Sequence, residues 1–195
     1  MRVGPIDIGA EYPPLIIAEL SGNHNQSLDR ALELVEAAAE SGVHAIKLQT
    51  YTPDTITLDS DKPGFIISDE SSPWSGRSLY QLYKEAHTPW EWHRPIVERA
   101  SELGMVWFSS PFDQTAVEFL EQLNAPAYKI ASFENCDIEL IKKVVSTGKP
   151  IIVSTGMASL SDLDQAVQTI RAGGCDEFAL LKCTSTYPAN PRSSN

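Results

Sequence analysis

Residues 151–174 read IIVSTGMASLSDLDQAVQTIRAGG and contain one complete strand-and-helix unit. The short apolar run Ile151–Ser154 is typical of a strand that is covered on both faces. Apolar residues then recur at spacings of three and four, which predicts a helix over Leu160–Ala172 with one apolar face. That face consists of Leu160, Leu163, Val167 and Ile170. Ser159 and Ser161 are candidate N-caps, and Gly173-Gly174 ends the helix.

The same alternation repeats from Leu15 onward and predicts parallel βα units. The expected strands are Leu15–Leu20, Ala45–Gln49, Met105–Ser109, Ala127–Ala131, Ile151–Ser154 and Phe178–Cys183. The other expected helices are one that ends near Glu40 and those at Trp92–Leu103, Thr115–Leu123 and Ile138–Ser146. We therefore predict an α/β fold of the (β/α)8 TIM-barrel kind, incomplete here with about six of eight βα units. An open sheet is the alternative, because such barrels need about 250 residues.

The segment Pro53–Pro89 interrupts this rhythm. It is rich in proline, glycine, aspartate and serine, and an aromatic-rich stretch, Leu79–Tyr83, follows within it. We interpret it as a long βα-loop insertion with one short helix. Loops of this length are commonly functional, so we expect a lid or an oligomer contact, with a solvated decoration as the alternative.

The composition and net charge of the chain limit the kinds of molecule that it can bind. The 195 residues carry a formal net charge of -11, which argues against nucleic acid but leaves a small phosphate possible. The three cysteines, Cys136, Cys175 and Cys183, form no CxxC pair, and no apolar run is long enough for a membrane span. We therefore expect a soluble, cytoplasmic protein.

Polar side chains gather at the carboxyl ends of the predicted strands, where reactive groups of α/β sheets and barrels collect. The stretch Lys129–Glu134, for example, follows an apolar strand with a cation, a hydroxyl and a carboxylate. A buried ammonium needs a compensating anion, and that anion can be the substrate. Similar ends carry Glu19, Lys47, Gln49, Ser110, Ser154, Ser185 and Tyr187.

Lys47 and Lys129 suit a ligand with a phosphate and a carboxylate, and serine hydroxyls could complete its hydrogen bonds. The candidate hydroxyls are those of Ser110, Ser132, Ser154 and Ser185. Glu134 could act as a general acid or base, or form a salt bridge to one of the lysines. His24 lies in an Asn-His-Asn turn, but no second histidine or cysteine has ligand spacing, so we predict no metal site.

Six segments at these strand ends, taken together, resemble the sialic acid synthase family. They are Ile17–Leu20 leading into Asn23-His24-Asn25, Lys47–Thr50, Ser109–Phe112, Lys129–Ser132, Ser154–Met157 and Cys183–Pro188. The resemblance runs in order over nearly the whole chain. Within the family, Tyr51–Thr57, Thr88–His93 and Ala131–Glu134 look most like the branch that makes pseudaminic acid, and the N-acetylneuraminate branch is the runner-up.

The resemblance implies a reaction in which phosphoenolpyruvate condenses with an amino-sugar aldehyde and water, and phosphate leaves by C–O cleavage. For the pseudaminic branch the sugar is 2,4-diacetamido-2,4,6-trideoxy-altrose; for the runner-up it is N-acetylmannosamine. It also implies that phosphoenolpyruvate binds Lys47, Ser110, Lys129, Ser132, Ser154 and Ser185. Gln49 and Tyr187 would face the sugar, and Glu19 and Glu134 would transfer protons.

The resemblance further implies a divalent metal, typically manganese, whose histidine ligands come from later strands than those present here. Residues 1–195 would be the N-terminal barrel portion, without the remaining units and the C-terminal antifreeze-like domain of a homodimer. We therefore expect the chain alone to bind phosphoenolpyruvate weakly and to lack synthase activity. The alternatives of another class are a class I aldolase with Lys129 as the imine-forming residue, and a non-catalytic interaction module.

Overall fold

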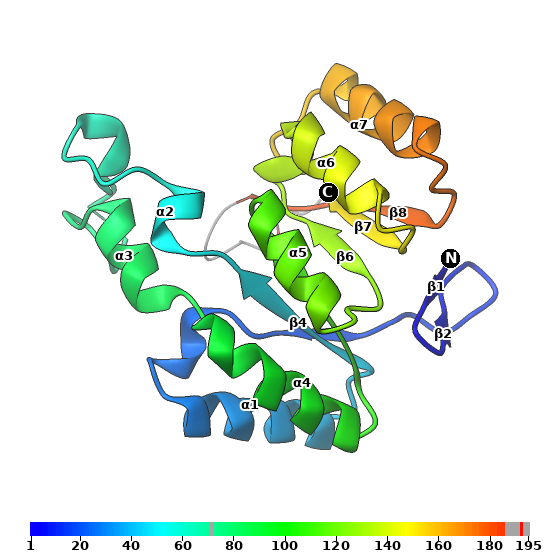
Figure 1. Cartoon of the computed structure of the whole chain (residues 1–195). Coiled ribbons are helices and arrows are strands. Elements are labelled where there is room, and N and C mark those ends of the chain that lie inside the picture. Colours follow the sequence, from blue (N-terminus) through cyan, green and yellow to red (C-terminus); the bar gives the residue numbers. More distant parts are fainter. Residues whose placement is uncertain (71, 186–191, 193–195) are drawn as a thin grey trace. The chain divides into compact units, whose positions relative to one another are not determined.

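The computed structural model describes residues 1–70, 72–185 and 192, and Figure 1 shows its elements. The chain forms two compact units, one of residues 16–107 and the other of residues 1–15 together with 108–195. The six parallel strands follow the order β3-β4-β5-β6-β7-β8, which is their order in the sequence. Successive neighbouring strands with helices between them are what the predicted barrel portion requires.

In the unit of residues 16–107, β3 (Ile17–Glu19) and β4 (Ala45–Thr50) pair in parallel, with Glu19 opposite Lys47. Helix α1 (Leu28–Glu40) connects them and packs along α4 (Trp90–Glu102). Arg99 of α4 binds Glu36 of α1 at 2.7 Å, an ion pair at the edge of this contact. The unit ends with the first residues of β5 (Val106–Pro111), where the Val106 N–H donates to the His44 carbonyl.

The insertion after β4 belongs to this unit and contains more helix than the sequence predicts. Besides α3 (Leu79–Ala86), which extends the expected Leu79–Tyr83, it contains α2 (Pro53–Ile56) and a 3-10 turn, Pro63–Phe65. Helix α2 was not predicted, although it starts with a proline and Thr52 and Thr55 form a capping box at its N-terminus. Four residues are too few for a visible apolar period.

In the second unit, β5 pairs with β6 (Tyr128–Ile130), β6 with β7 (Ile151–Ser154), and β7 with β8 (Phe178–Leu181), all in parallel. The intervening helices are α5 (Gln114–Gln122), α6 (Ile138–Val145) and α7 (Leu160–Ala172). Their inward side chains and those of the strands form a buried apolar core. Its fully buried members include Leu120, Ile130, Ile141, Val153 and Ile170.

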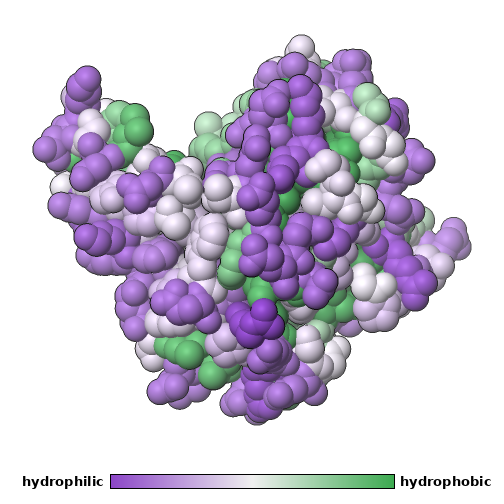
Figure 2. Space-filling model, in the orientation of Figure 1, coloured by the Kyte–Doolittle hydropathy of each residue, from purple (hydrophilic) through white to green (hydrophobic). Residues whose placement is uncertain are grey.

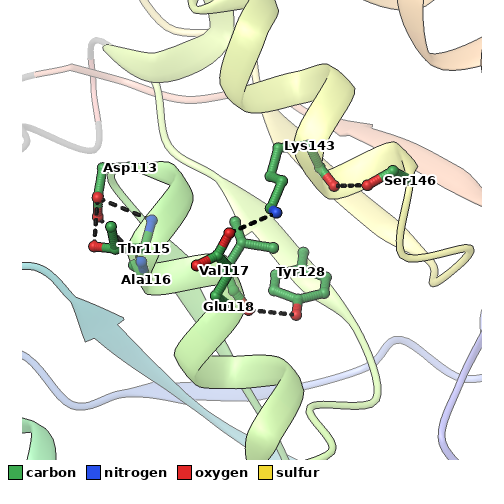
Figure 3. Close-up of polar contacts among 8 residues, drawn as sticks. All are labelled: Asp113, Thr115, Ala116, Val117, Glu118, Tyr128, Lys143 and Ser146. Atoms are coloured by element: carbon green, nitrogen blue, oxygen red, sulfur yellow. Dashed lines mark hydrogen bonds and ion pairs between the residues drawn. The ribbon is translucent and has the colours of Figure 1, made fainter.

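Polar contacts fasten α5 to its neighbours (Figure 3). The Asp113 carboxylate caps the helix by accepting from the Thr115 and Ala116 N–H groups. Farther along, Lys143 of α6 binds Glu118 at 2.8 Å. The buried Tyr128 hydroxyl of β6 donates to the Glu121 carboxylate at 2.6 Å and also lies 3.4 Å from the Val117 carbonyl. Hydrophilic residues cover most of the face in Figure 2, with apolar residues in small groups between them.

One predicted burial is wrong. Leu160 was expected on the apolar face of its helix, but it is the first residue of α7 and its side chain is 87% exposed. Ala166 and Ile170 are the buried residues of that helix. The helix starts after Ser159, so Ser159 and not Ser161 is the N-cap.

Strands β1 (Arg2–Val3) and β2 (Ile6–Asp7) form a small antiparallel hairpin at the N-terminus, which was not predicted from the sequence. The hairpin belongs to the second unit, where the Arg2 N–H donates to Glu177 at 2.6 Å and Val3 is buried. Across the described residues, no helix is long and apolar enough to cross a membrane.

Candidate functional site

The second unit contains a buried cation at the carboxyl end of its strands. Lys129 of β6 is 6% exposed, and its Nζ donates to the Ser154 Oγ of the neighbouring strand β7 and to the Ile130 carbonyl. The charge of Lys129 also acts on the carboxyl of Glu134, whose pKa it lowers. A buried ammonium at the end of a strand is a suitable binding group for an anionic ligand, because charge-assisted hydrogen bonds are strong where water is excluded.

Three buried polar atoms at the same strand ends have no hydrogen-bond partner among the described residues. They are the Ser110 Oγ on β5, the Glu134 Oε2 after β6 and the Ser185 Oγ after β8. Each such atom costs about 1–3 kcal/mol when left unpaired, so native proteins rarely keep several without a function. A ligand rich in hydrogen-bond acceptors would satisfy the hydroxyls.

Gly156, on the loop after β7, brings two of the predicted hydroxyls close together. A Cβ at this position would lie 2.7 Å from the Ser132 Oγ and still closer to the Ser185 Oγ. Only glycine leaves room for both hydroxyls here. The second unit therefore brings together Lys129, Ser132, Ser154 and Ser185, as predicted from the sequence.

Glu134 has the titration behaviour of a proton-transfer group. The pKa of its carboxyl is raised from 4.5 to about 7, chiefly by burial. Its own backbone N–H and the charge of Lys129 lower this pKa, and the nearby Asp137 raises it. The group therefore exchanges its proton near neutral pH. A carboxyl with this pKa can act as either general acid or general base.

The unit of residues 16–107 holds the other predicted cation. Lys47 is buried on β4, and its Nζ lies 3.4 Å from the exposed carboxylate of Glu19 at the end of β3. This ion pair follows from the strand register, which sets the two residues opposite each other. Gln49 is half-buried and projects from the same face of β4 as Lys47, because side chains alternate along a strand. The last predicted residue, Tyr187, lies outside the described residues.

Asn135 is a further buried polar residue, which was not predicted from the sequence. Its Nδ2 donates to the carbonyls of Ser154 and Gly156, both at 3.1 Å. It directly follows Glu134 in the 3-10 turn Glu134–Cys136. A single asparagine in a turn is common, and the sequence offers no sign that its partners lie about twenty residues away.

His24 has a packing role in the structure. It is buried, with Nε2 3.2 Å from the Thr88 Oγ1 and its ring edge-on to Trp92 at 5.4 Å. Burial, and then the neighbouring His87, lower its pKa, so the ring is neutral at pH 7. In the described part of the chain, no three His, Cys, Asp or Glu side chains lie close enough together to hold a metal ion. These residues therefore do not fit the manganese site that the family resemblance implies.

The fold and the site together are those of the (β/α)8-barrel class of proteins. This class has parallel strands in chain order, helices between them and polar groups at the carboxyl ends of the strands. A solved structure supports this class. The N-acetylneuraminic acid synthetase of Leptospira borgpetersenii, in complex with citrate, superposes on the whole chain with a TM-score of 0.86 and 29% identity, the chain covering 62% of it. The fold is thus that of the barrel, as predicted.

The particular family follows from the sequence. The NeuB family matches residues 34–195, and the chain belongs to this family. The pseudaminic acid synthase of Helicobacter pylori is 48% identical over 183 residues, 94% of this chain and 53% of its own length. The pseudaminic acid synthase of Campylobacter jejuni is 48% identical over 188 residues, 96% of this chain and 54% of its own length. The chain therefore spans about half the length of these relatives.

Proposed function

We propose that this chain supplies the phosphoenolpyruvate-binding residues of a pseudaminic acid synthase. The observation that carries the proposal is the set of unpartnered polar atoms, Ser110 Oγ, Ser185 Oγ and Glu134 Oε2, at the strand ends that also present Lys129. Phosphoenolpyruvate has a phosphate and a carboxylate, which accept hydrogen bonds. Ammonium and hydroxyl groups supply the matching donors.

In the proposed reaction, C3 of phosphoenolpyruvate attacks the aldehyde carbon of the sugar, and water adds at C2. The tetrahedral intermediate then loses phosphate by C–O cleavage. The new alkoxide needs a proton, and the attacking water must lose one. Glu134, with a pKa of about 7, is suited to the first or the second transfer, and Glu19 is the other candidate.

The cations in this proposal bind and orient phosphoenolpyruvate. Lys129 would neutralise its phosphate or carboxylate, while Ser132, Ser154 and Ser185 donate hydrogen bonds. Lys47 and Gln49 are proposed to bind phosphoenolpyruvate and the sugar, respectively, as the family resemblance implies. A divalent metal, if bound as the family resemblance implies, would polarise the aldehyde. The roles proposed here for the residues of this chain do not depend on that metal.

The sugar is proposed to be 2,4-diacetamido-2,4,6-trideoxy-altrose. The 48% identity to two pseudaminic acid synthases supports it over N-acetylmannosamine, since the N-acetylneuraminic acid synthetase structure is 29% identical. The longest natural protein that contains this sequence would be incubated with phosphoenolpyruvate, manganese and each sugar in turn. We expect pseudaminic acid and phosphate, detected by mass spectrometry, with the first sugar; product with N-acetylmannosamine alone would reassign the substrate.

Binding of phosphoenolpyruvate tests the role of Lys129 on this chain itself. We expect a dissociation constant in the millimolar range, measured by calorimetry, that rises about tenfold or more in Lys129→Met, a loss of roughly 1.4 kcal/mol. The control is Lys142→Met, which removes an exposed lysine that pairs with Glu139 on α6. Equal affinity in the two variants would contradict the proposed role.

The class I aldolase alternative predicts a different chemistry for the same lysine. An imine between Lys129 and pyruvate would be trapped by borohydride and would add mass at that residue. We expect no such adduct, because the Lys129 Nζ donates to Ser154 Oγ in hydroxyl-rich surroundings. Covalent capture on Lys129 would favour the aldolase. A chain without affinity for phosphoenolpyruvate or pyruvate would favour an interaction module.

A further inference from the structure

Asn135 links two neighbouring loops of the candidate site. It lies in the turn between β6 and α6, directly after Glu134, and is 1% exposed. Its side-chain amide has two N–H groups, and it donates to two carbonyls, those of Ser154 and Gly156, at 3.1 Å each. The Cys136 thiol donates to its Oδ1 at 3.1 Å, so each polar atom of the amide is engaged.

The two carbonyls that Asn135 holds belong to the turn of residues 154–156, which leaves β7. This turn contacts three candidate binding residues: Ser154 Oγ accepts from Lys129 Nζ, and Gly156 lies against the hydroxyls of Ser132 and Ser185. A small displacement of the turn would therefore move the hydroxyl groups relative to the lysine.

The residue that follows the turn has a backbone conformation that its own local preferences disfavour. Met157, the next residue, has φ of 63°, in the left-handed region that residues with a side chain rarely adopt. Its side chain is exposed and gains little from packing. The hydrogen bond from Asn135 to the Gly156 carbonyl fixes the peptide that leads into Met157, and so helps to hold this disfavoured conformation.

We propose that Asn135 is a positioning residue of the anion site, which fixes the turn of residues 154–156 so that the hydroxyls of Ser132, Ser154 and Ser185 face one ligand together with Lys129. Asn135 touches none of the ligand atoms itself. This inference rests on the proposed binding of phosphoenolpyruvate.

The test compares Asn135→Asp with Asn135→Ala by titrating the 195-residue chain with phosphoenolpyruvate at pH 8 and at pH 5.5. At pH 8 an aspartate would face two carbonyl oxygens with a negative charge, and we expect at least a tenfold loss of affinity relative to the unmodified chain. Burial against carbonyls raises the pKa of that carboxyl. At pH 5.5 its protonated form donates one hydrogen bond, and we expect the loss to shrink to threefold or less.

The alanine variant has no proton to regain, so its loss of affinity should be the same at both pH values. Comparing each variant with the unmodified chain at the same pH cancels the titration of phosphoenolpyruvate itself. The matched control is Asn124→Asp, which adds the same charge at an exposed position after α5 and should bind like the unmodified chain at both pH values.

Circular dichroism checks that each variant is folded. If both Asn135 variants unfold, Gly156→Ala displaces the same turn with the asparagine intact, because its methyl group meets the Ser132 and Ser185 hydroxyls; we then expect at least a tenfold loss. If the Asn135 variants are folded and bind within twofold of the unmodified chain, the positioning role is overturned and the proposed function is left intact. If only Gly156→Ala is folded, binding within twofold by that variant has the same meaning. An unmodified chain that binds no phosphoenolpyruvate would overturn both.

Discussion

At the scale of single residues, Glu134 makes a measurable prediction about stability. Its pKa is about 7 in the folded chain and 4.5 when exposed, so folding favours the protonated form. Its contribution is therefore fully favourable below pH 4.5 and is lost as the pH rises through 7. We expect Glu134→Gln to be more stable than the unmodified chain at pH 8, by about 3 kcal/mol, and to lose this advantage at pH 4.5.

Urea unfolding at the two pH values measures this difference. The control is Glu139→Gln, which removes a carboxylate from an exposed ion pair of α6 and should change the unfolding free energy by less than about 0.5 kcal/mol. A Glu134→Gln chain that is less stable than the unmodified one at pH 8 would mean that the carboxylate has a stabilising partner.

Some features of single residues in the candidate site could be predicted from the sequence, and others could not. Lys129 and Ser154 could be predicted as neighbours, because the carboxyl ends of parallel strands meet at one edge. The raised pKa of Glu134 could not be predicted, since it depends chiefly on how deeply the folded chain buries the carboxyl. The role of Asn135 could not be predicted, because every residue has a backbone carbonyl. The sequence therefore does not indicate which carbonyls an asparagine will bind.

At the scale of elements, the N-terminus of α7 offers a comparison between two serines of the same loop. Ser159 accepts from the Asp162 N–H, and the Asp162 carboxylate accepts from the Ser159 N–H, a complete capping box. We expect Ser159→Ala to lower the unfolding free energy by about 1 kcal/mol.

Ser161→Ala is the matched control for that prediction, because Ser161 is exposed within the first turn of the helix. We expect a change of less than about 0.5 kcal/mol, since alanine is also the better helix former. Thermal or urea unfolding gives both values. The sequence offered either serine as the cap, and equal losses in the two variants would contradict the observed start of the helix.

A second element-scale prediction concerns His93, which joins α4 to β4. Its Nε2 accepts from the Thr50 hydroxyl at 2.9 Å, and burial lowers its pKa from 6.5 to about 4. A lowered histidine pKa contributes stability above pH 6.5 that is lost as the pH falls through 4. We expect the unmodified chain to lose about 3 kcal/mol through this residue between pH 7 and pH 4, and His93→Gln to lack this part of the pH dependence in urea unfolding. A variant with an unchanged acid slope would assign the loss to other groups.

At the scale of the whole molecule, the six strands and five of the helices could be predicted because each spans enough residues to show an apolar run or period. Their observed limits differ from the expected ones by a few residues, as with β8, which ends at Leu181 rather than Cys183. The N-terminal hairpin has two residues per strand and is held by tertiary contacts such as Arg2 with Glu177. Its formation depends on a distant partner, so no local pattern predicts it.

The last strand of the sheet leads to a prediction about association. In the described part of the chain, β8 is the terminal strand and pairs with β7 alone, and its Leu180 and Leu181 are each 46% exposed. Apolar edge strands favour pairing with another copy, whereas the net charge of -11 opposes it. We expect the apparent mass in light scattering to rise with protein concentration, and to rise more at 0.5 M salt, where charge repulsion is screened. Leu180→Glu should suppress the rise in apparent mass. The control is Ser161→Glu, which adds the same charge at an exposed position of α7 and should not suppress it. A monomer at every protein and salt concentration would show that this edge is protected.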